Sequence, residues 1–113
     1  MTASLSTHVL DTARGLPATG VHVSLHARAG EGWSLIGSGE TDADGRQRTL
    51  VPAGAVLSLG TYRITFDTAS YGKKTGTVVF FPEIAIVFQI DSDTHHHVPL
   101  LLSPFGYATY RGT

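Results

Sequence analysis

The sequence contains no cysteine, so disulfide bonds and thiolate chemistry are excluded from its fold and its function. Only 15% of the residues are charged, the net charge is −1, and the eight Lys and Arg residues are scattered along the chain. Without a basic face, nucleic acid is not an expected partner. The longest apolar runs, such as residues 84–88, are too short to cross a bilayer, so no membrane association is expected.

Several functional motifs are also missing. The opening segment, "MTASLSTHVLD", has no basic stretch followed by an apolar one, so it does not read as a secretory signal and a cytosolic location is expected. There is no serine-nucleophile elbow and no glycine loop that could hold phosphate. If the chain is an enzyme, histidine and arginine must therefore carry the chemistry, with water as the nucleophile.

The length and the apolar pattern predict one all-β domain over residues 1–113. Residues 21–27, "VHVSLHA", alternate apolar and polar side chains as a half-buried strand does, and the glycines at 30–33 predict a hairpin. A short helical turn is expected at 68–76, capped by Asp67 or Thr68 and ended by Gly76. The other expected strands cover residues 5–11, 33–39, 61–67, 81–91, 96–103 and 106–112. This pattern predicts an antiparallel β-sandwich of seven or eight strands.

Histidine is the most distinctive residue type, with six copies: His8, His22, His26, His95, His96 and His97. Residues two apart in a strand face the same side at about 6.5–7 Å, so His95 and His97 could bind one metal ion, with His8 as a third ligand. No "HExxH" helix or cysteine pair accompanies them, and we predict no resident metal or other cofactor. His22 and His26 are expected on the polar face of their strand.

Two further positions have open interpretations when they are taken alone. His8 lies among apolar residues, where it is either a hydrogen-bonded structural residue or a functional one. Arg46 directly follows the predicted turn "TDADG". An arginine at such a position is most often a solvated charge on a loop. The closing segment "YATYRG" keeps a strand-like alternation almost to Thr113, which predicts an ordered end.

Three motifs taken together carry a family resemblance. They are "LSTHVLD" at residues 5–11, "TDADGR" at 41–46 and "HHHVPLLLSPFGYATYRGT" at 95–113. The chain resembles the 5-hydroxyisourate hydrolases, the transthyretin-related proteins of purine catabolism. The resemblance implies a transthyretin-like sandwich and a homotetramer with active sites where two dimers meet. The implied reaction is hydrolysis of 5-hydroxyisourate to 2-oxo-4-hydroxy-4-carboxy-5-ureidoimidazoline.

The resemblance also implies the site residues. It gives catalytic roles to His8, Arg46 and His97, and substrate contacts to His8, Arg46, Tyr110 and Thr113. A neutral imidazole of His8 or His97 would take a proton from water, and Arg46 would stabilise developing negative charge. The sequence leaves open which histidine is the base and which the acid.

Two departures from the family pattern are present. His96 stands where the family commonly has tyrosine, and Thr113 stands where the family ends in serine. We expect His95 to be structural or to support the site indirectly, and His96 to point the other way. Two alternatives to the hydrolase are a transthyretin-like carrier and a His-rich metal-binding β-module. The vertebrate transthyretins lack the closing "YRG" tail and the active-site histidine set, which argues against a carrier.

Overall fold

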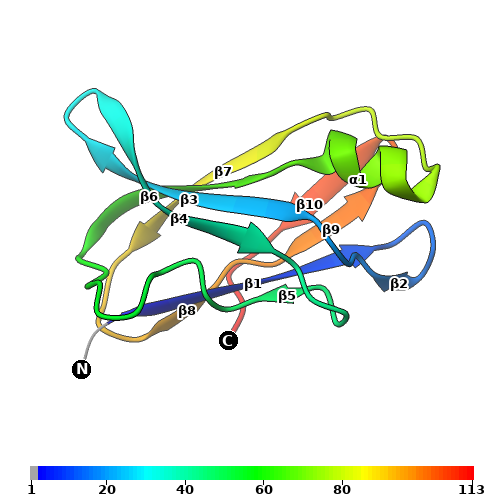
Figure 1. Cartoon of the computed structure of the whole chain (residues 1–113). Helices are drawn as coiled ribbons and strands as arrows, with labels where there is room; N and C mark the ends of the chain where they lie inside the picture. Colours follow the sequence, from blue (N-terminus) through cyan, green and yellow to red (C-terminus); the bar gives the residue numbers. More distant parts are fainter. Residues whose placement is uncertain (1–2) are drawn as a thin grey trace.

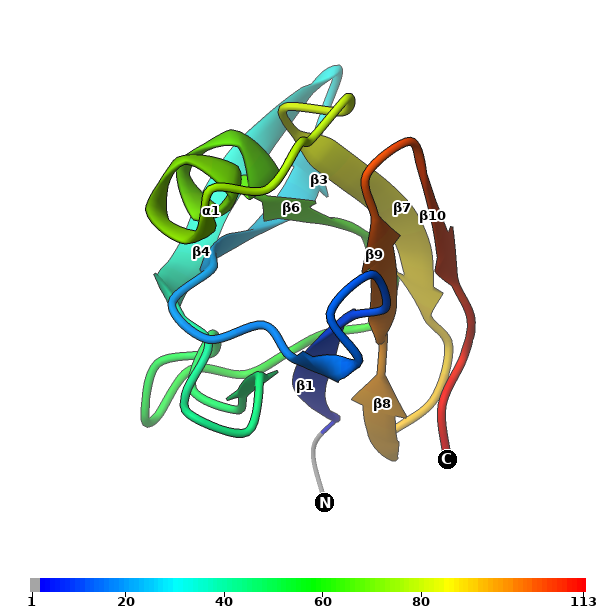
Figure 2. The same cartoon turned by 90° about the vertical axis from the view of Figure 1, so that its right-hand side faces the viewer.

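Two β-sheets pack against each other in the computed structural model, which describes residues 3–113 (Figure 1 and Figure 2). The elements are β1 (Ser4–Asp11), β2 (Leu16–Pro17), β3 (His22–Ala29), β4 (Gly32–Glu40), β5 (Arg46–Gln47), β6 (Gly60–Phe66), α1 (Thr68–Thr75), β7 (Ile84–Ile90), β8 (His95–His97), β9 (Leu100–Ser103) and β10 (Gly106–Thr109). One sheet has the order β4-β3-β6-β7. The other has the order β10-β9-β1-β2, with β5 and β8 also paired to β1.

The predicted all-β sandwich with one short helix is confirmed. β2 and β5 have two residues each, and the eight longer strands match the seven or eight that were expected. The strand expected at 96–103 is divided at Val98–Pro99 into β8 and β9, because proline cannot donate to the ladder. β7 begins at Ile84, after Pro82, and β10 ends at Thr109 rather than at residue 112.

The sandwich was predicted to be antiparallel, but strand β1 has two parallel neighbours. β1 pairs in parallel with both β8 and β9, whereas every other strand pair in the described part of the chain is antiparallel. The parallel pairs arise because the chain reaches β8 from the far sheet, through the end of β7, and enters the second sheet in the same direction as β1 (Figure 1). This arrangement places residues 95–97 directly beside residues 4–6.

The core explains why β1 presents polar side chains outward. Leu5 and Val9 on β1 are buried in one hydrophobic core together with Leu25, Ile64 and Phe66 of the other sheet. Side chains of a strand alternate between the two faces, so residues 4, 6, 8 and 10 of β1 lie on the outer face of the sheet. The alternation that makes the core therefore also places Ser4, Ser6 and His8 together on the outside.

The helix α1 has the expected caps. Asp67 is the N-cap, and its carboxylate accepts a hydrogen bond from the Ser70 backbone N–H at 3.1 Å. Gly76 ends the helix with a φ of 69°, a left-handed conformation that glycine adopts without strain. The buried Tyr71 fixes the helix to β1 by donating its O–H to the carboxylate of Asp11 at 2.7 Å. No helix among residues 3–113 is long and apolar enough to cross a membrane.

Candidate active site

Strand β1 brings three of the predicted site residues together. His8 is aligned with Arg46 of β5, and Ser6 is aligned with His97 of β8. Aligned residues of paired strands share a face, and Ser6 and His8 share the outer face of β1. The side chains of His8, Arg46 and His97 therefore lie on the same face of one sheet, although they come from three distant parts of the sequence.

The turn before Arg46 holds that residue in register with His8. The carboxylate of Asp42 accepts hydrogen bonds from the backbone N–H groups of Asp44 and Arg46, both at 2.9 Å. These bonds lower the pKa of Asp42, the contact with Arg46 most strongly. Gly45 has a φ of 76°, and a Cβ at this position would lie 2.4 Å from the backbone oxygen of Val9, so the turn requires glycine.

His8 is half-buried and has one ring nitrogen engaged. Its Nε2 lies 2.8 Å from the backbone oxygen of Asp44. A carbonyl oxygen only accepts, so Nε2 carries a proton, and a neutral ring keeps its lone pair on Nδ1. The turn that orders Arg46 thus also sets the orientation and the tautomer of His8.

His97 is held in its neutral form by its surroundings. Burial lowers its pKa below the ordinary value of 6.5, and the charges of Arg46, His8 and His95 lower it further. The Oγ of Ser6 lies 2.7 Å from Nδ1 of His97. A neutral imidazole at this place can accept a proton from water near pH 7.

His95 lies in the same hydrogen-bonded row. Its Nδ1 is 2.6 Å from Oγ of Ser4, and its Nε2 is 2.8 Å from Oγ of Ser6. Ser6 therefore bridges the rings of His95 and His97. Neither serine was among the residues selected from the sequence, since the only indication was their position four and two residues before His8 in "SLSTH".

The closing segment packs directly on His97. The Gly112 N–H donates to the backbone oxygen of His97 at 2.8 Å. A Cβ on Gly112 would lie 2.4 Å from Cδ2 of the His97 ring, and the residue does not have a left-handed backbone. Glycine is thus required here by the imidazole ring and not by backbone conformation.

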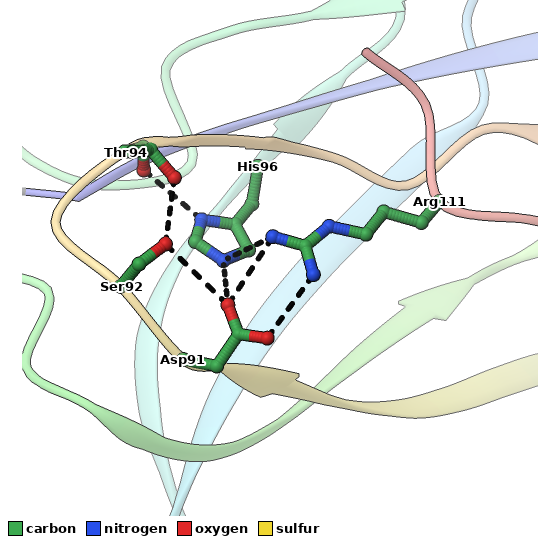
Figure 3. Close-up of polar contacts among 5 residues, drawn as sticks. All are labelled: Asp91, Ser92, Thr94, His96 and Arg111. Carbon is green, nitrogen blue, oxygen red and sulfur yellow. Dashed lines mark hydrogen bonds and ion pairs between the residues drawn. The ribbon is translucent and has the colours of Figure 1, made fainter.

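A cluster of Asp91, His96 and Arg111 fastens this segment to the end of β7 (Figure 3). The guanidinium of Arg111 donates to both carboxylate oxygens of Asp91, at 3.1 and 3.2 Å. The Nδ1 of His96 donates to the backbone oxygen of Thr94 at 3.0 Å, and its Nε2 lies 3.1 Å from Asp91. Arg111 and then His96 lower the pKa of Asp91 to about 2, so this carboxylate stays ionised at neutral pH.

His96 points away from the active-site face, as expected, and it is buried rather than solvated. The roles of Asp91 and Arg111 were not predicted. Asp91 gives no motif of its own, and Arg111 was considered only as part of the closing "YRG". His22 is exposed and His26 half-buried on β3, in the opposite sheet, as predicted for the polar face of a strand.

Tyr110 and Thr113 are both exposed. Tyr110 lines a cavity of about 280 Å³ together with Phe88, Thr109 and His97. His8 and Arg46 are not part of that cavity. The structure records no hydrogen bond from the side chain of Tyr110 or Thr113 within residues 3–113, so their substrate contacts stay predictions.

The metal alternative required a cluster of ligands around His95 and His97. Within the described range 3–113, no group of three or more His, Asp or Glu side chains could hold a metal ion. The rings of His95 and His97 are instead bridged by the hydroxyl of Ser6.

Comparison with known proteins places the chain in one family. The model of the HIUase/transthyretin family matches residues 5–112. A 5-hydroxyisourate hydrolase of Salmonella dublin is 46% identical over 110 residues, covering 96% of this chain and 80% of the relative. The solved 5-hydroxyisourate hydrolase of Klebsiella pneumoniae is 38% identical over the whole of both chains, with a TM-score of 0.84. Sea bream transthyretin, solved with thyroxine, is 32% identical over 97% of this chain and 95% of its own, with a TM-score of 0.89. This chain belongs to the HIUase/transthyretin family.

Proposed function

We propose that this protein hydrolyses 5-hydroxyisourate to 2-oxo-4-hydroxy-4-carboxy-5-ureidoimidazoline during urate degradation, and that residues 1–113 act as a single catalytic domain. One observation carries the proposal: His8, Arg46 and His97 lie on one face of the sheet around β1. Curated relatives named 5-hydroxyisourate hydrolase, 42–46% identical over nearly the whole chain, support the same reaction. A cytosolic location stays a prediction from the sequence.

The proposed mechanism uses the protonation states of the two histidines. His97 is the general base: its neutral ring takes a proton from water while the oxygen attacks a ring carbonyl of the substrate. Arg46 stabilises the negative charge on the carbonyl oxygen. His8 orients the water through Nδ1, since its Nε2 is bound to Asp44. The C–N bond then breaks, and the leaving nitrogen takes the proton from His97.

The test of this proposal is a coupled assay. Urate oxidase produces 5-hydroxyisourate in the cuvette, and its ultraviolet absorbance is followed with and without the protein. We expect the absorbance to decay faster in proportion to the protein concentration. A decay rate that is independent of the protein would overturn the hydrolase.

We propose a homotetramer in which the active-site face is covered by another dimer. Beside His8, this face carries the half-buried Leu10 and Leu101, which are aligned on β1 and β9. The strands β7 and β10 each end their sheet and lie at the same side of the sandwich (Figure 2), with Val87 54% exposed and Tyr107 44% exposed. Such open edges favour pairing with another copy.

The oligomeric state can be measured by sedimentation equilibrium. We expect a mass four times the 12.0 kDa of one chain. A species of one or two chains at assay concentration, with full activity, would contradict the tetramer and leave the hydrolase reaction in place.

A further inference from the structure

A row of alternating serine and histidine side chains runs along the outer face of β1 and β8 and ends at His97. Its members, in order, are Ser4, His95, Ser6 and His97, with consecutive distances of 2.6, 2.8 and 2.7 Å. Ser4 and His95 are exposed, Ser6 is 8% exposed and His97 is half-buried. The row thus connects the proposed general base to solvent. The pairing of β1 with β8 builds it, because Ser4 is aligned with His95 and Ser6 with His97.

When all four groups of this row are neutral, their hydrogen bonds all point in the same direction, either away from His97 or toward it. A hydroxyl donates one hydrogen, and a neutral imidazole has one N–H and one lone pair. If Nδ1 of His97 donates to Ser6, then Ser6 donates to Nε2 of His95, and Nδ1 of His95 donates to Ser4. The Nε2 of His97 then carries the lone pair, as a base requires. In the opposite direction, Nε2 of His97 carries the proton, as an acid requires.

The proposed reaction creates a need for such a path. Water supplies two protons, of which one goes to the leaving nitrogen. The product carries a carboxyl group that is ionised at neutral pH. The second proton must therefore leave the site in every turnover. A tetramer contact beside His8, at Leu10 and Leu101, would make direct escape from His97 harder. The row leads instead to Ser4, at the opposite end of β1 from Leu10, and so offers another route.

We propose that Ser6 and His95 relay this proton from His97 to solvent, an inference that rests on the proposed hydrolase function. His97 first passes the proton of the attacking water to the leaving nitrogen. When the carboxyl group of the product ionises, Nε2 of His97 takes this second proton, the Nδ1 proton of His97 passes to Ser6 Oγ, and the Ser6 proton passes to Nε2 of His95. The Nδ1 proton of His95 leaves through Ser4 to bulk water, and the row is then reversed. After the product has left, Nε2 of His97 gives its proton to water in the emptied site, and a proton from bulk water enters through Ser4 and passes back along the row to Nδ1 of His97, which restores the starting state. His95 acts through Ser6 and does not touch the substrate.

The test compares His95→Gln with a matched control, His22→Gln. Glutamine keeps one acceptor and a donor for the two serines, but it cannot pass a proton through its side chain. We expect His95→Gln to lower kcat about tenfold or more, as part of the 10²–10⁴-fold that acid–base groups contribute, with KM unchanged. Added free imidazole should restore much of the lost kcat. His22 is exposed on β3 of the other sheet, so His22→Gln should keep wild-type kcat and not respond to imidazole.

Each outcome separates the relay from the proposed function. A wild-type kcat in His95→Gln would overturn the relay and leave the hydrolase standing. A lower kcat that imidazole does not restore, or a change confined to KM, would assign His95 a structural role and also overturn the relay. An inactive wild-type protein would overturn the hydrolase, and the relay would fall with it.

A second variant tests the bridge itself. Ser6→Ala removes the hydroxyl between His95 and His97. We expect kcat to fall as in His95→Gln, and the double variant to be no slower than the slower single one, since both changes interrupt one path. If the fold loss of kcat in the double variant equals the product of the two single losses, the two residues act independently and a shared relay is contradicted. A thermal melt of each variant shows whether the fold is retained.

Discussion

Replacement of His97 by asparagine is expected to lower kcat/KM by about 10²–10⁴-fold, the range for loss of a general base. Asparagine is smaller than histidine and can keep a hydrogen bond to Ser6, but it cannot take a proton from water near pH 7. His97 is half-buried at the outer face of the sheet, so the core is not disturbed. The coupled assay gives kcat/KM, and a thermal melt shows whether the fold is retained.

The control for this variant is His22→Asn, which changes an exposed histidine on the other sheet. It should keep wild-type kcat/KM. Near-normal turnover in His97→Asn, with a normal melt, would remove His97 from the mechanism.

The pH profile provides an independent check on His97. A base must be neutral, and the neutral fraction falls as the pH drops through the pKa of the ring. Burial, followed by Arg46, His8 and His95, lowers that pKa below 6.5, so the acid limb of kcat/KM should lie below pH 6.5. Removing the charge in Arg46→Met should move the limb toward higher pH. A limb above pH 6.5 in the wild-type protein would contradict this role.

The sequence pattern was sufficient for most of the secondary structure. Alternation with a period of two identified the long strands, and the Asp67 and Gly76 caps located the helix, because these are local properties of the chain. The parallel pairing of β1 with β8 and β9 was not predictable in the same way. Alternation shows which side chains face the core, but it does not show which strand lies beside which.

The same limit applies to the site. His8, Arg46 and His97 were selected through a family resemblance, whereas the residues alone left Arg46 as a loop charge. Strand register gives the physical reason that they belong together. Ser6 and the Asp91–Arg111 pair were missed, because a serine in a strand or an aspartate in a loop has no pattern of its own. Their partners lie at distant positions, so only the fold reveals these contacts.

Gly112→Ala is expected to lower kcat/KM by about 10²-fold with little loss of stability. The added Cβ would lie 2.4 Å from Cδ2 of His97, so the ring or the closing segment must move by about 1 Å, and a displacement of that size in an active site costs about 10²-fold. The segment cannot move freely, because Gly112 is bonded to the His97 backbone and Arg111 to both oxygens of Asp91. We therefore expect the imidazole to shift.

The matched control is Gly106→Ala, where a Cβ would meet only Oγ of Ser103, at 3.7 Å. This variant should keep wild-type activity. Normal activity in Gly112→Ala would show that the closing segment moves to accommodate the Cβ and does not position the imidazole ring of His97. A second test loosens the closing segment. Asp91→Asn removes the charge that holds Arg111, so adding it to Gly112→Ala should recover part of the activity that Gly112→Ala alone loses. A further loss in that double variant would mean that the Asp91–Arg111 pair supports the site by a route other than Gly112.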